Sequence, residues 1–207
     1  MSQGIQDGHL GPCAVYAKKV DSAIDDKATG DGWFKLWHEG FDDAEGKWCT
    51  TKFIKNKGYL SVDFPPNMKG GDYLIRPELL ALHAAGNGEP QFYLGCAQVF
   101  LQSSGTLLPD ETVSIPGYIK KNDPSVTYNY WKKTGEDYEL PGPPVLESFS
   151  PSGSQGPSEQ TEGLKPEGCI LEIANMCVEE FPEPSDVQEC WDVSDQIPWA
   201  RCCSPRS

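Results

Sequence analysis

A histidine, a glutamine and a tyrosine stand at spacings that could place them around a metal ion. Residues 90–96 read Pro-Gln-Phe-Tyr-Leu-Gly-Cys, and because side chains alternate along a strand, Gln91 and Tyr93 would share one face. The preceding predicted strand ends at His83, and a glycine-containing turn over 84–89 leads back to Gln91. If the two strands pair as a hairpin, an imidazole, an amide and a phenol converge. Groups of this kind commonly surround and tune a protein-bound metal.

The elements that would position these residues are short strands. Residue alternation and the β-branched and aromatic residues predict strands over 12–20, 33–37, 47–54, 73–83, 91–101 and 127–131. Pro77 lies inside the fourth of these, so that run should form an edge strand or a bulged strand. Glycine (21 residues), proline (18 residues) and aromatic residues (11%) are plentiful, which suits strands joined by turn-rich loops. The composition therefore predicts an all-β sandwich or barrel.

The net charge of the chain argues against some classes of binding partner. The chain carries 31 Asp and Glu residues against 17 Lys and Arg residues, a formal net charge of −14. Such a surface repels phosphate backbones, so we expect no nucleic-acid partner, and for the same reason no anionic membrane partner. No stretch of the sequence is long and apolar enough to span a bilayer. A neutral polymer is compatible with this surface, because stacking and hydrogen bonds would recognise it.

The eight cysteines indicate an oxidising compartment. Their spacings fit no zinc template, because the sequence has no C-x-x-C pair and only three histidines. A disulfide-bearing secreted protein is the better interpretation. The first eight residues have no basic region followed by an apolar run, so they do not form a signal peptide. We therefore expect an extracellular protein whose N-terminal part is absent from this chain.

Composition divides the chain into three predicted parts. Residues 9–144 contain the predicted strands and would form the β-sandwich. Residues 145–167 are rich in Pro, Gly, Ser and Glu, which is typical of a flexible linker. Residues 168–207 hold five of the eight cysteines, which favours a small Cys-rich extension stapled by disulfides.

Six segments, taken in order along the chain, resemble the signatures of fungal lytic polysaccharide monooxygenases of auxiliary activity family 9, formerly glycoside hydrolase family 61. They read His-Leu-Gly-Pro at 9–12, Trp-Cys-Thr at 48–50, Tyr-Leu-Ile-Arg-Pro-Glu-Leu-Leu-Ala-Leu-His at 73–83, Gln-Phe-Tyr-x-x-Cys at 91–96, Ile-Pro-Gly-Tyr at 115–118 and Asp-Pro-Ser-Val at 123–126. Each segment alone is weakly specific, and their order along the chain makes the resemblance strong.

The resemblance implies an immunoglobulin-like or fibronectin III-like β-sandwich with one type 2 copper at a flat surface. By the same resemblance, His9 is a histidine ligand and Tyr93 the axial ligand, while His83 and Gln91 act as catalytic residues beside the metal. Nitrogen ligands with a weak axial oxygen suit Cu(II). The family's other ligand, an N-terminal histidine, matches no residue here. We therefore expect a sandwich that is incomplete at its N-terminus and a chain that binds copper weakly.

Three further residues take roles from the resemblance. Trp131 aligns with a substrate-facing aromatic residue of the family, although tryptophan stands where tyrosine is usual. An exposed indole can stack on sugar rings through its flat apolar face. Cys13 and Cys49 resemble a disulfide pair that part of the family has.

The activity implied is the oxidative cleavage of cellulose or a related β-glucan by hydroxylation at C1, C4 or both. It would need a small-molecule or protein reductant and O2 or H2O2 as co-substrate, and we expect a secreted monomer. The alternative is a non-catalytic, secreted carbohydrate-binding β-sandwich that kept His83, Gln91 and Tyr93 without their chemistry. The residue that follows signal cleavage in the full gene product would separate these hypotheses, because only the enzyme needs a histidine there.

Overall fold

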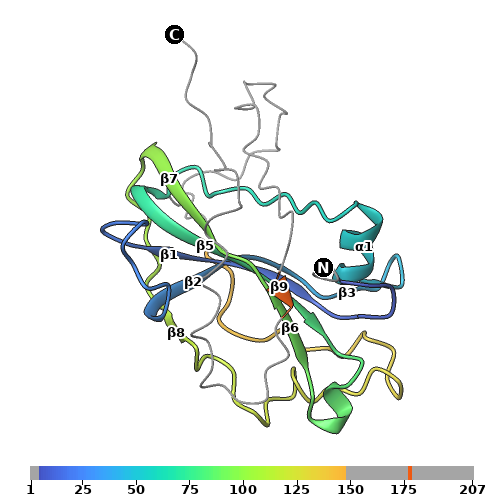
Figure 1. Ribbon diagram of the computed structural model, residues 1–207. Coiled ribbons are helices and arrows are strands. Elements are labelled where there is room, and N and C mark those ends of the chain that lie inside the picture. Colours follow the sequence, from blue (N-terminus) through green and yellow to red (C-terminus); the bar gives the residue numbers. More distant parts are fainter. Residues whose placement is uncertain (1–4, 148–176, 179–207) are drawn as a thin grey trace.

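Strands make up most of the regular structure in the computed structural model, which describes residues 5–147 and 177–178 (Figure 1). The elements are β1 (Cys13–Lys19), β2 (Gly30–Glu39), β3 (Phe41–Asp42), β4 (Lys47–Trp48), α1 (Cys49–Lys55), β5 (Lys69–Ala81), the 3-10 turn η1 (Ala85–Asn87), β6 (Gln91–Leu94), β7 (Ala97–Ser104), β8 (Val113–Ile115) and β9 (Cys177–Val178). The predicted all-β class is therefore confirmed, with one short helix added.

One antiparallel sheet runs through the molecule in the strand order β8-β2-β1-β5-β6-β9, and β7 also pairs with β5. Strands β3 and β4 form a separate hairpin next to α1. Strands β1 and β5 therefore lie in the middle of the sheet, and Figure 1 shows them crossing the centre of the molecule. The functional candidates all stand on or beside β5 and its neighbours.

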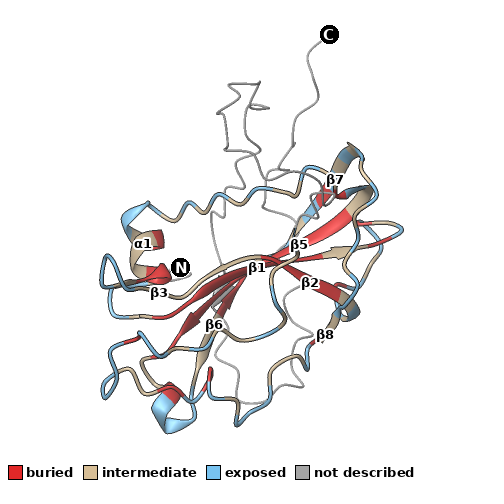
Figure 2. Ribbon diagram, turned by 180° about the vertical axis from the view of Figure 1, so that it is seen from behind, coloured by how far each residue is buried: buried red, intermediate tan, exposed pale blue. Residues whose placement is uncertain are grey.

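Both faces of the central strands are covered. Tyr16 of β1 packs with Trp33 in one core cluster, whereas its neighbours Val15 and Ala17 pack in another. Figure 2 shows that the buried residues concentrate along β1, β2, β5 and β6, while exposed residues occupy the loops. Burial on both faces is what a β-sandwich requires. The curled, sandwich-like sheet matches the predicted fold class.

Strand β5 is a central strand, which corrects the prediction of an edge strand; of the alternative, a bulged strand, the register shift occurs between Lys69 and Gly71 in the pairing with β7 and not at Pro77. It pairs with β1 on one side and with β6 and β7 on the other. The predicted strand over 91–101 is in fact interrupted opposite Pro77, where Gly95 and Cys96 separate β6 from β7. The Gly95 N–H still donates a hydrogen bond to the Pro77 carbonyl at 3.2 Å. Proline has no N–H to donate to a neighbouring strand. Pro77 can therefore lie in a central strand because the neighbouring strand is broken opposite it.

The strand predicted over 47–54 is mostly the helix α1. Its β-branched residues favoured a strand, but Cys49, Thr50 and Phe53 are buried at spacings that lie on one side of a helix. The disulfide between Cys13 and Cys49 joins the start of this helix to the start of β1. Tertiary contacts therefore outweigh the local preference, and the predicted pairing of these two cysteines is present in the structure.

Lys35 of β2 is a buried cation that holds the chain after residue 140. Its side chain is 1% exposed, and Nζ donates to the Pro141 carbonyl at 2.6 Å and contacts His38 Nδ1 at 3.2 Å. The Leu146 N–H donates to the Lys35 carbonyl at 2.8 Å, and Val145 forms a parallel bridge with Lys35. The first residues of the predicted linker thus lie against the sheet.

Burial of Lys35 predicts a rise in stability at alkaline pH. Desolvation lowers its pKa from 10.5 to about 8, opposed by the charge of Glu78. Between these values the unfolded chain binds a proton that the folded chain releases, so the free energy of unfolding rises with pH. Below about pH 8 this contribution is lost. Urea unfolding of the wild type and Lys35→Met from pH 7 to pH 10 should show a difference that grows above pH 8; a constant difference would contradict the assignment.

Most of the predicted linker and of the predicted Cys-rich extension lies outside the described residues. The cysteines of the extension other than Cys177 are among the residues that are not described. Within the extension, Cys177–Val178 forms β9, which pairs antiparallel with β6. Among the helices of the described residues, none is long and apolar enough to cross a membrane. The division at residues 144 and 167 stays a prediction.

Candidate metal centre

His9 lies beside the end of β5 because the segment before β1 continues the antiparallel pairing. The Leu82 N–H donates to the Leu10 carbonyl at 2.8 Å. At Gly11 the two backbones approach so closely that a Cβ atom would stand 1.8 Å from the Leu80 carbonyl oxygen. Only glycine allows this approach. The sequence His-Leu-Gly-Pro therefore fixes the position of His9 through its backbone.

The β5–β6 hairpin confirms the pairing expected from the sequence. Leu79 stands opposite Tyr93 and Ala81 opposite Gln91, so the two polar residues share one face of β6. The Tyr93 hydroxyl donates to Gln91 Oε1 at 3.3 Å. His83 follows β5 by two residues, at the same end of the hairpin.

The structure brings the two histidines and the tyrosine together. The ring centroid of His9 lies 4.8 Å from that of His83 and 5.5 Å from that of Tyr93. Tyr93 is buried, whereas His9, His83 and Gln91 are half-buried, so the group opens to the surface. An imidazole therefore stands between a second imidazole and a phenol. The chemical roles of these residues stay predictions.

The imidazole of His9 is held neutral. Burial lowers its pKa below 6.5, and the neighbouring His83 lowers it further. The Gln6 N–H donates to His9 Nδ1 at 3.0 Å, so the neutral ring carries its proton on Nε2. A metal binding through Nε2 would move that proton to Nδ1 and break the hydrogen bond to Gln6. Neutral imidazole is the form that binds metals.

His83 carries a buried nitrogen without a partner. Its Nδ1 is buried and makes no hydrogen bond within the described part of the chain. Its backbone carbonyl accepts a hydrogen bond from Trp131 Nε1 at 3.1 Å. An unsatisfied buried nitrogen at a site is a group that can take up a proton or a ligand.

Trp131 lies next to this group and is 74% exposed. The segment that carries it is a turn, which corrects the strand predicted over 127–131. Tyr128 is drawn into the core, where its hydroxyl donates to Asp137 Oδ1 at 2.6 Å and accepts from the Gly135 N–H at 3.0 Å. These two hydrogen bonds hold the segment where a strand would have used backbone hydrogen bonds to a neighbouring strand. Tyr130 stacks on Trp131, with ring centroids 4.5 Å apart, a contact that no feature of the sequence predicted.

The side chains present can hold part of a copper site. Within residues 5–147, no group of three or more His, Cys, Asp and Glu residues is placed to hold a metal ion. His9 and Tyr93 do offer an imidazole nitrogen and a phenol oxygen, both accepted by Cu(II). These two donor atoms suit copper. A tetragonal copper site uses more than two donor atoms, so they make up only part of one.

The site thus joins two histidines and a tyrosine beside the end of β5 in a β-sandwich, and comparison with known proteins shows which family has this fold. The family model for Auxiliary Activity family 9, formerly GH61, matches residues 1–138. The chain therefore belongs to Auxiliary Activity family 9.

Individual relatives agree with this assignment. An AA9 family lytic polysaccharide monooxygenase C from Aspergillus tamarii is 49% identical over 199 residues, covering 90% of this chain and 53% of that protein. The solved structure of CvAA9A superposes with a TM-score of 0.65 at 28% identity, covering 70% of this chain and 67% of that one. A cellulose-active polysaccharide monooxygenase from M. thermophila gives a TM-score of 0.54 at 30% identity, covering 68% and 67% of the two chains. This chain spans about half the length of the Aspergillus relative.

Proposed function

We propose that this chain carries part of the active site of a secreted, copper-dependent oxidoreductase that cleaves cellulose or a related β-glucan by oxidation at C1, C4 or both. The observation that supports it most is the placement of His9 within 4.8 Å of His83 and 5.5 Å of Tyr93, measured between ring centroids. Membership of Auxiliary Activity family 9 supports the same chemistry.

His9 and Tyr93 are the residues proposed to hold copper. When bound, the metal would supply one-electron redox chemistry toward O2 or H2O2, with electrons from an external reductant. The neutral imidazole of His9 suits a metal ligand because burial and His83 disfavour its protonation. The hydroxyl of the buried Tyr93, which donates to Gln91, would be a weak oxygen donor to the metal.

Two side chains beside these ligands are proposed to take part in proton transfer. His83 has a buried Nδ1 without a hydrogen-bond partner, so its imidazole can accept or release a proton there. The Gln91 amide accepts from the Tyr93 hydroxyl, which orients both side chains. Neither residue needs to bind the metal to act in this way.

The substrate contact is proposed to be Trp131. Its 74% exposed indole presents a flat apolar face next to His83, which suits stacking on a pyranose ring. A net charge of −14 favours a neutral glucan over an anionic polymer. We propose an extracellular monomer that uses a small-molecule or protein reductant.

The same exposure of Trp131 supports a second candidate function, a carbohydrate-binding module without catalysis. Two metal donors among the described residues would make copper binding weak, whereas stacking on Trp131 needs no metal. The two functions differ in one observable: only the oxidoreductase produces oxidised oligosaccharides.

The test is a cleavage assay on swollen cellulose with copper and ascorbate, read by mass spectrometry of the soluble products. It compares this chain with a version extended at its N-terminus by the matching segment of the Aspergillus tamarii relative. The extended form should release C1- or C4-oxidised products, and this chain should release few. Equal cleavage by both forms would mean that the proposed ligand set is wrong. Binding to cellulose without oxidised products from either form would favour the second candidate.

A further inference from the structure

Trp131 is exposed to solvent and yet fixed in orientation. Its indole N–H donates to the His83 carbonyl at 3.1 Å, across 48 residues of sequence. Its ring stacks on Tyr130 with an interplanar angle of 28°. A side chain that is 74% exposed would otherwise be free to change rotamer. These two contacts hold the indole against the turn that follows β5.

The segment that carries Trp131 is anchored in the core. Tyr128 is buried and packs edge-to-face on Trp48 and Tyr138, with ring centroids 6.1 and 5.0 Å away. Its hydroxyl donates to Asp137 and accepts from the Gly135 N–H, which fixes the outer end of the ring. Trp131 therefore extends from a rigid base.

A second contact joins this segment to the turn over 84–89. The Asn129 side chain lies against Gly86, where a Cβ atom would stand 2.8 Å from Asn129 Nδ2. The turn itself contains η1 and closes with the Gly88 N–H donating to the Ala85 carbonyl at 2.9 Å. The core-anchored segment therefore touches the turn at Gly86 and at the His83 carbonyl.

The imidazole of His83 depends on this backbone for its position. Its Nδ1 makes no hydrogen bond in the part of the chain that the structure describes. The ring also contacts His9, at a centroid distance of 4.8 Å. A shift of the His83 carbonyl would therefore carry the imidazole with it.

We infer that Trp131 is a positioning residue: its indole N–H fixes the His83 backbone, and a sugar ring stacked on the indole tightens the turn that carries the His83 imidazole. This coupling rests on the proposed function for its substrate, a β-glucan. It is specific to an indole, because the bond uses the ring N–H that phenylalanine lacks. Binding of the polysaccharide is thereby linked to the position of the His83 imidazole, which is proposed to transfer protons.

The experiment measures amide hydrogen exchange of the full chain by NMR, comparing the wild type with Trp131→Phe. Phenylalanine keeps a flat ring and removes the N–H. Amides of residues 84–89 should exchange about threefold to tenfold faster in the variant, as expected for the loss of one hydrogen bond. Phe100→Ala, which removes another exposed ring on the distant strand β7, is the matched control and should leave residues 84–89 unchanged. Equal exchange in Trp131→Phe and the wild type would overturn the proposal.

Adding cellohexaose tests whether a sugar bound at Trp131 tightens the turn over 84–89. At a sugar concentration that saturates each protein, it should slow exchange of residues 84–89 in the wild type and cause no slowing in Trp131→Phe. Equal slowing in both proteins would overturn the coupling. Absence of cellohexaose binding by the wild type would overturn the coupling together with the proposed substrate. The comparison without sugar would still decide whether Trp131 fixes the turn.

Discussion

Replacing Glu78 by alanine should lower the free energy of unfolding by about 3–5 kcal/mol, because it leaves a buried guanidinium without its counter-charge. Glu78 is 4% exposed and Arg76 is 9% exposed, and Arg76 Nε donates to Glu78 Oε1 at 2.7 Å. The Tyr118 hydroxyl donates to the other carboxylate oxygen. Burial, followed by the Glu78 charge, raises the pKa of Tyr118 well above 10, so the phenol stays a donor. Urea unfolding would measure the loss.

The double variant Arg76→Met, Glu78→Leu is the matched control. It removes both charges and keeps apolar volume, so its stability should lie within about 1–2 kcal/mol of the wild type. A loss in Glu78→Ala no larger than in the double variant would mean that the buried charges are not coupled. Arg76 and Glu78 lie on β5, which ends two residues before His83, so this pair supports the site as well as the core.

Loss of the Cys13–Cys49 disulfide should have a comparable effect. The bond closes a loop with a sequence separation of 36, for which loop entropy gives about 4 kcal/mol. The double variant Cys13→Ala, Cys49→Ala should therefore unfold about 10 °C lower, measured by circular dichroism. Dithiothreitol should lower the melting temperature of the wild type by more than that of the variant. An equal melting temperature for the wild type and the variant without reductant would contradict this role.

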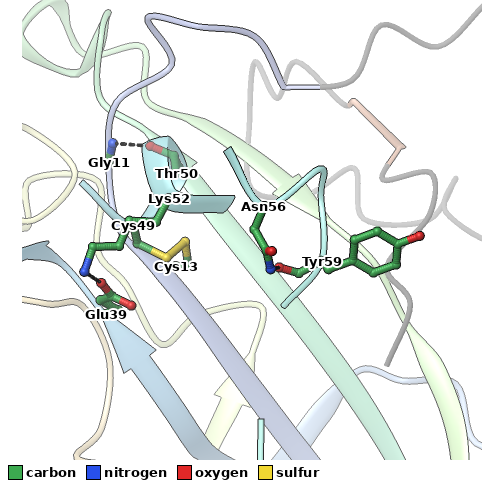
Figure 3. Close-up of a disulfide and its surroundings, with 8 residues drawn as sticks. All are labelled: Gly11, Cys13, Glu39, Cys49, Thr50, Lys52, Asn56 and Tyr59. Atoms are coloured by element: carbon green, nitrogen blue, oxygen red, sulfur yellow. Dashed lines mark hydrogen bonds and ion pairs between the residues drawn. A yellow bond between two sulfur atoms is a disulfide. The ribbon is translucent and has the colours of Figure 1, made fainter. Parts of the chain in front are cut away.

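The disulfide also affects the position of His9, the proposed metal ligand. Figure 3 shows Thr50, the residue after Cys49, with its side chain directed at the Gly11 backbone. The Gly11 N–H donates to Thr50 Oγ1 at 3.0 Å, and the Thr50 N–H donates to the Gly11 carbonyl at 3.2 Å. Helix α1 thereby holds the segment that bears His9, two residues away. Breaking the disulfide should loosen His9 as well as the fold.

The local geometry of the candidate site was predictable because it depends on strand periodicity. Alternation alone placed Gln91 and Tyr93 on one face, and a short glycine-containing turn implied that His83 would meet them. His9 was different, since nothing in its local sequence says that it lies next to His83. Only the resemblance to the family predicted that approach.

The failures share a physical cause, which is that long-range contacts override local preference. The β-branched residues of 49–55 form a helix because Cys49 and Phe53 are buried against the sheet. The aromatic run at 128–131 forms a turn because Tyr128 packs into the core. Pro77 predicted an edge, but the break between β6 and β7 accommodates it. None of these contacts is encoded within the segment itself.

The most direct test of the proposed copper site is a Cu(II) titration of this chain followed by electron paramagnetic resonance, which detects nitrogen ligands. The three histidines provide the variants His9→Ala and His83→Ala and, as matched control, His38→Ala, because His38 contacts Lys35 and not the site. We expect one weakly bound Cu(II) that loses its nitrogen signal and at least about tenfold in affinity in His9→Ala. His83→Ala should bind copper with a smaller loss and His38→Ala with none. Unchanged binding by His9→Ala, or an equal loss in His38→Ala, would contradict the account.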